Sequence, residues 1–80
     1  MNYGQLLEAI ESNFDAQKLV RSEIADKLDY IKNPTIFSEF VYGDKRAIAA
    51  KVRTKVKLLQ RLKRIQNLNI AKLADLNNQK

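Results

Sequence analysis

Residues 44–64 read DKRAIAAKVRTKVKLLQRLKR, and this stretch predicts one long amphipathic helix. Its apolar side chains recur every three or four residues, a spacing that places them along one side of a helix. This apolar stripe consists of Ile48, Val52, Val56, Leu59 and Leu62. Asp44 can cap the helix, because a carboxylate is stabilised at the positive end of the helix dipole. We expect the stripe to be buried against the rest of the chain.

Basic side chains are concentrated in the same stretch. Nine Lys or Arg residues occupy its 21 positions, and Asp44 is the only acid. At about 100° per residue, five of them fall within roughly 80° of one another, nearly opposite the apolar stripe. This basic row consists of Arg46, Arg53, Lys57, Arg61 and Arg64. It spans about 27 Å at 1.5 Å per residue, which is long enough to touch several phosphates.

The N-terminal residues predict further helix. Asn2 and Gln5 have the spacing of a capping box, so we expect a first helix from about Tyr3 to Asn13. Asp15 can cap a second helix that ends near residue 32, ahead of the Pro at position 34. The spacing leaves open whether residues 12–15 form a turn or a weak point in one continuous helix. The predicted core residues here are Leu6, Leu7, Ile10, Phe14, Leu19, Val20, Ile24, Leu28 and Ile31.

Two further segments are ambiguous from the sequence. Residues 35–42 fit a short helix closed by Gly43, and they also alternate as a strand. We expect the helix, because a lone strand would leave its backbone groups unpaired. The long basic helix either breaks at Asn67 and Asn69 or continues to Leu76. The fold predicted is all-α: a small single-domain bundle of three to five helices over residues 1–80, with a long basic C-terminal helix and frayed last residues.

The charge is distributed unevenly between the two halves of the chain. Residues 1–43 carry four basic residues and seven acids, whereas residues 44–80 carry eleven basic residues and two acids. The 80-residue chain as a whole has a net charge of +6. Some of the acids can pair with the basic helix, within a chain or between chains. They are too few to cancel it, so a positive field remains on residues 44–80.

Catalytic and metal-binding chemistry is poorly supported. The chain has no Cys and no His, which removes thiolate sites and the usual general base near neutral pH. We therefore expect no enzyme activity, no catalytic residues, no metal site and no cofactor. No apolar run approaches the roughly 18 residues that cross a bilayer, and no targeting segment is visible. We expect a cytoplasmic, intracellular protein without a membrane partner.

Two weaker patterns compete with a simple helical bundle. Residues 23–40 resemble a helix-turn-helix, but Asp29 and Tyr30 stand where the motif has Gly, and its second helix would carry no Lys or Arg. An ordinary helix pair is the favoured reading of that segment. The long helix also has coiled-coil spacing at four apolar positions, which Lys55, Gln66 and Asn69 interrupt. Packing against a partner helix is favoured over a long zipper.

The basic row provides the functional hypothesis. Charged faces on soluble helices usually mix signs, whereas this one is nearly purely positive. We expect a non-catalytic accessory protein that binds DNA or RNA through the phosphate backbone with low sequence specificity. The alternative is a helical interaction or assembly module that docks on an acidic protein or self-associates as a homo-oligomer.

Overall fold

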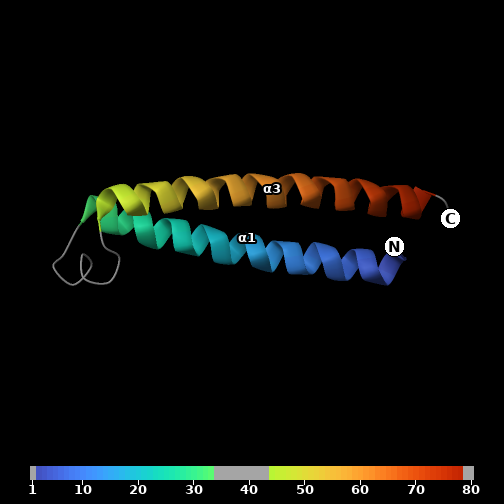
Figure 1. Cartoon of the computed structure of the whole chain (residues 1–80). Coiled ribbons are helices and arrows are strands. Elements are labelled where there is room, and N and C mark those ends of the chain that lie inside the picture. The colour runs from blue at the N-terminus through green and yellow to red at the C-terminus, as the bar shows by residue number, and fades with distance from the viewer. Residues whose placement is uncertain (1, 34–43, 79–80) are drawn as a thin grey trace.

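Two long antiparallel α-helices make up the described part of the chain (Figure 1). The computed structural model describes residues 2–33 and 44–78, with α1 spanning Tyr3–Lys32 and α3 spanning Lys45–Asn78. The two chain ends lie at the same end of this hairpin. Its radius of gyration is 17.4 Å, whereas a compact domain of this size has about 12 Å. The protein is therefore elongated, measuring 59 × 16 × 16 Å.

The all-α class is confirmed, but the predicted bundle of three to five helices is wrong for the described residues, which form two. Much of the difference comes from α1, which runs without a break through residues 12–15. Asn13, which could have started a turn, instead directs its side-chain amide across to α3. The helix expected over residues 35–42 lies outside the described residues.

Both ends of α1 lie where the sequence predicts them. The capping box is present: Gln5 N donates to Asn2 Oδ1 at 2.8 Å, and Asn2 N donates to Gln5 Oε1 at 3.1 Å. These two bonds satisfy backbone donors that the first helical turn leaves without partners. At the other end, Asn33 N donates to Asp29 O at 2.8 Å. The helix ends at Lys32, as expected upstream of the Pro at position 34.

Helix α3 begins directly after Asp44, whose side chain accepts a hydrogen bond from Arg46 N at 3.3 Å. The carboxylate therefore caps this helix, as its position predicts. The helix then continues through Asn67 and Asn69 and ends at Asn78. Of the two alternatives considered for this region, the continuous helix is confirmed.

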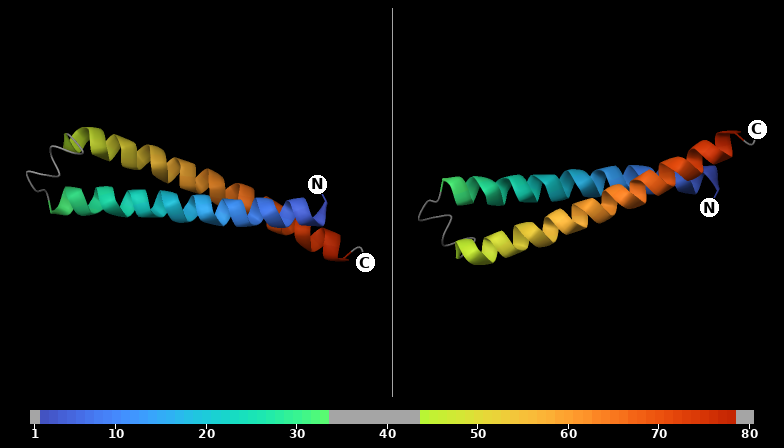
Figure 2. Two further views of the ribbon diagram at one scale, coloured as in Figure 1. Left: turned by 90° about the horizontal axis from the view of Figure 1, so that it is seen from below. Right: turned by 90° about the horizontal axis from the view of Figure 1, so that it is seen from above.

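The contact between the helices follows a heptad seam. In each helix the inward positions are separated alternately by four and three residues, the 3.5-residue spacing that makes two helices coil around each other. Figure 2 shows the helices crossing at a shallow angle. The seam consists, in α1, of Leu6, Ile10, Asn13, Gln17, Val20, Ile24, Lys27 and Ile31, and in α3 of Ile48, Val52, Lys55, Leu59, Leu62, Gln66, Asn69, Leu73 and Leu76, all buried or half-buried.

Five of the predicted core residues are exposed: Leu7, Phe14, Leu19, Leu28 and Val56. The other predicted core residues are buried or half-buried. The prediction assumed a wide apolar stripe, which a helix needs when it has several neighbours. Each helix here has one described neighbour, and a two-helix seam covers about two positions in seven. The additional apolar positions therefore remain accessible to solvent.

Three buried amides form a polar layer near the middle of the seam. Asn13 Nδ2 donates to Leu62 O at 3.0 Å, and Gln66 Nε2 donates to Ile10 O at 3.1 Å. Gln17 Nε2 donates to Asn13 Oδ1 at 2.6 Å. Asn13 and Gln66 bind the backbone of the opposite helix, so they specify which residues of α1 and α3 lie level with each other, and Gln17 holds the Asn13 side chain from within α1. We refer to Asn13, Gln17 and Gln66 as the amide layer.

Replacing Ile48 by Ala tests the seam. The Ile48 side chain is only 1% exposed, and removing a buried aliphatic side chain costs about 2 to 5 kcal/mol. Leu68→Ala is the control, because Leu68 is 58% exposed and surface changes stay within about 0.5 kcal/mol. Urea unfolding at one fixed protein concentration gives both values. Equal losses from the two variants would contradict the seam described here.

Candidate nucleic-acid interface

All five residues of the basic row lie on α3 and are exposed. Their spacing places them on the side of the helix opposite the seam, facing away from α1. Within residues 2–33 and 44–78, none of the five side chains takes part in an ion pair. The structure therefore brings the predicted site residues together on one accessible surface and leaves their charges unneutralised by described residues.

The continuity of α3 determines the shape of this surface. Because the helix has no break between Lys45 and Asn78, the row follows one continuous element for about 27 Å. Arg and Lys are good helix formers, so the charged positions also favour the helix that carries them. The positions of the basic row are therefore set by the backbone hydrogen bonds of a helix and do not depend on the conformation of a loop.

The two helices differ strongly in charge. Helix α3 carries ten basic residues and one acid, a net charge of +9. Helix α1 carries four basic residues and six acids, a net charge of −2. Since α1 packs against the seam side of α3, its acids do not cover the basic row. The positive field is therefore directed away from the hairpin on the outer side of α3.

Lys55 is an exception among the basic residues of α3. It occupies a seam position and forms a salt bridge with Glu23 of α1. The hydrogen bond from Lys55 holds the pKa of the Glu23 carboxyl below its ordinary value, and the charges of Lys55 and Lys27 act in the same direction. The predicted pairing between the acidic and basic halves thus occurs at the seam, at a lysine outside the basic row.

The sequence alone did not predict that Lys55 pairs with Glu23. The available signal was the place of Lys55 in the heptad spacing, where it interrupts a run of apolar residues. A charged residue at such a position needs a partner from the facing helix. Predicting that partner required knowing that α1 packs antiparallel to α3, and also which residues of the two helices lie level with each other.

Other kinds of site find limited support in the described ranges. No group of three or more His, Cys, Asp or Glu residues there could hold a metal ion, and neither described helix is long and apolar enough to cross a membrane.

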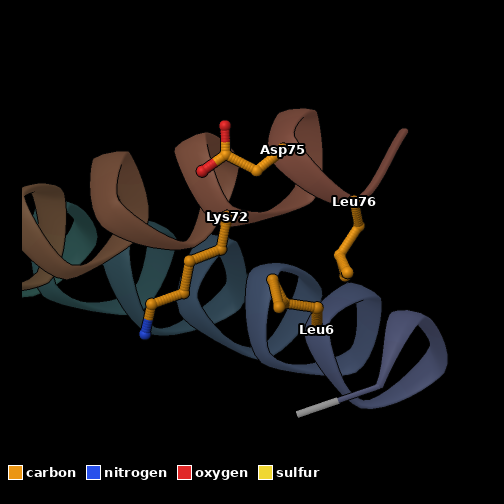
Figure 3. A pocket seen from close by; sticks show the side chains of 4 residues that line it. All are labelled: Leu6, Lys72, Asp75 and Leu76. Atoms are coloured by element: carbon orange, nitrogen blue, oxygen red, sulfur yellow. The ribbon is translucent and has the colours of Figure 1, made fainter. Parts of the chain in front are cut away.

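A shallow groove at the open end of the hairpin is lined by Leu6, Lys72, Asp75 and Leu76. Figure 3 shows the Leu6 and Leu76 side chains directed into the space between the two helices, while Asp75 points away from it.

Comparisons of the chain with protein-family models, with curated proteins and with solved structures found no match.

Changing Glu23 to Gln tests the seam ion pair. A carboxyl with a lowered pKa stabilises the fold above its unfolded-state pKa, and this contribution is lost as the pH falls through the lower folded-state pKa. Glu23→Gln is therefore expected to lower the free energy of unfolding at neutral pH and to have no effect at about pH 2, where the Glu23 carboxyl is protonated in both the folded and the unfolded state. Urea unfolding at both pH values measures this.

Asp26→Asn is the control for that experiment, because Asp26 is an exposed acid on the same helix. It removes one negative charge without touching the salt bridge. An equal loss of stability from both substitutions, or a Glu23→Gln difference that persists unchanged in acid, would contradict a specific Glu23–Lys55 interaction.

Proposed function

We propose that the protein is a non-catalytic accessory protein that binds nucleic acid through the basic row. The observation that carries this proposal is a set of five exposed basic side chains within one sector of a continuous helix, with no ion pair among the described residues. Such a surface attracts a polyanion, because binding releases the counterions condensed on it.

The chemistry of the row favours phosphate as the group contacted. Four of its five members are Arg, whose planar guanidinium can hold two phosphate oxygens at once. Duplex DNA carries one charge per roughly 1.7 Å of its axis, so about 27 Å of helix lies beside some 16 phosphates. Five contacts would therefore involve only about a third of the phosphates that lie beside the row.

Low sequence specificity follows from what the row lacks. Base edges are read mainly by side chains that pair with two atoms in a groove, and single-stranded bases stack on aromatic rings. The row contains no Asn or Gln, and α3 contains no Phe, Tyr or Trp. The proposed contacts are thus with the sugar–phosphate backbone, for which DNA and RNA are both candidates.

The salt dependence of binding to random-sequence duplex DNA tests this proposal. Four or five phosphate contacts give a slope of log K against log salt near −4. The triple variant Arg53→Gln, Lys57→Gln and Arg61→Gln is expected to flatten that slope by about two to three and to weaken all sequences alike. Gln is a good helix former, so circular dichroism should remain unchanged.

A matched control removes the same charge from the other helix. Lys18, Arg21 and Lys32 are exposed on α1, and changing all three to Gln should alter the slope much less. Equal effects from the two triples would mean that net charge alone drives binding. No measurable affinity for duplex or single strands at about 50 mM salt would overturn the proposal. The acidic-protein alternative would then be the one to pursue.

A further inference from the structure

Five large apolar side chains are exposed along one side of the hairpin. They are Leu7, Phe14 and Leu28 of α1 and Val56 and Ile70 of α3, and we call them the apolar face. All five positions are separated by multiples of seven residues within their helix, and each directly follows a seam position. This spacing places them on the same side of each helix.

The apolar face extends across the two helices at Phe14 and Ile70. Phe14 and Ile70 line one shallow groove together with Arg21 and Lys63, and the buried amides Gln17 and Gln66 belong to the same lining. The face therefore runs from α1 over the seam to α3. Soluble monomers rarely expose large contiguous apolar patches, which are typical of interaction surfaces.

The same groove contains an unsatisfied polar atom. Gln66 is 4% exposed, its Nε2 donates to Ile10 O, and its Oε1 has no hydrogen-bond partner within the described part of the chain. Buried carbonyl oxygens are almost always paired. This oxygen therefore needs a hydrogen-bond donor from outside the two described helices.

We propose that the apolar face is the interface with a second copy of this chain, giving a four-helix dimer. The net charges of α1 and α3 favour one of two possible twofold arrangements. A twofold axis along the hairpin places α1 of each copy against α3 of the other, pairing a helix of net charge −2 with one of +9. An axis across the hairpin would place the two +9 helices against each other, which like-charge repulsion disfavours.

The alignment within one hairpin makes this arrangement self-complementary. Asn13 lies level with Leu62, and Ile10 with Gln66. Counting in opposite directions along the two helices places Leu7 within about two residues of the level of Ile70, and Phe14 within about two residues of the level of Lys63, an offset of at most about 3 Å at 1.5 Å per residue. In the dimer, Leu7 faces Ile70 of the second copy, and the Phe14 ring faces the Lys63 ammonium of the second copy in a cation–π pair.

The available area is sufficient for such a dimer. Helix α1 has 30 residues, so it is about 45 Å long, and two helices side by side are about 20 Å wide. One long side of the hairpin therefore covers about 900 Å², compared with the roughly 800 Å² per partner of a typical stable interface. The basic row lies on the outer side of α3 and is not needed for this contact.

Sedimentation of the full chain over a concentration series tests the proposal. The unmodified protein is expected to show the mass of a dimer, and the double variant Leu7→Glu, Ile70→Glu, which places two carboxylates opposite each other across the interface, that of a monomer. Leu19→Glu, Leu68→Glu is the matched control, because these leucines are 62% and 58% exposed but lie off the apolar face. The control should remain a dimer. An unmodified protein that is monomeric at every concentration overturns the proposal, as does a double variant of the face that stays dimeric or a control that dissociates equally.

Disulfide trapping tests the arrangement without relying on variants that weaken it. The sequence has no cysteine, so a chain carrying Leu7→Cys and a second chain carrying Ile70→Cys each have one thiol. Mild oxidation of the mixture should link the two chains. A link that forms instead between Leu7→Cys and Leu28→Cys chains would place α1 against α1 and contradict the proposed axis. No link in either mixture would overturn the interface.

Discussion

The alignment of α1 and α3 depends on the hydrogen bonds of the amide layer. Heptad seams of Leu, Ile and Val repeat every seven residues, so apolar packing alone tolerates sliding by a heptad. The amides do not. Displacing α1 by seven residues would separate Asn13 Nδ2 from Leu62 O and Gln66 Nε2 from Ile10 O. A buried amide left unpaired costs about 1 to 3 kcal/mol, a large part of the stability of so small a domain.

A narrow seam determines which surfaces remain available. One side of each helix faces the other, so the remaining apolar positions and the basic row stay exposed. The apolar face adjoins the seam, whereas the basic row lies on the outer side of α3. The two proposed sites therefore do not overlap, and the proposed binding of a second copy would leave the basic row free for a polyanion. In the proposed dimer the two basic rows lie on opposite outer sides, where each can reach a separate stretch of nucleic acid.

Local chemistry was predictable from the sequence. The Asn2–Gln5 capping box, the Asp44 cap and the end of α1 at Lys32 follow from side-chain hydrogen bonding and from proline. The basic row was also predictable as a set, because helical spacing alone places its members on one side. These features involve residues a few positions apart, so no knowledge of the tertiary contact is needed.

The predictions that were wrong or undecided concern features that depend on how many neighbours a helix has. Periodicity identified Leu7, Phe14 and Leu28 as apolar and roughly inward-facing, but their burial requires a further helix beside α1. The continuity of α1 was undecidable locally, since Asn13 suits a turn as well as a buried hydrogen bond to α3. Lys55 and Gln66 were noted as interruptions of a coiled-coil pattern. They are in fact seam positions, whose partners Glu23 and Ile10 come from a distant part of the chain.

Nuclear Overhauser effects from the side-chain amide protons of the amide layer report on the alignment of α1 and α3. We expect contacts from the Asn13 amide protons to Leu62 and from the Gln66 amide protons to Ile10, two pairs far apart in the sequence. Contacts between Leu62 and Leu6 or Val20, each one heptad from Asn13, would show that the helices are aligned differently. That result would contradict the role assigned to the amide layer and the self-complementary alignment derived from it.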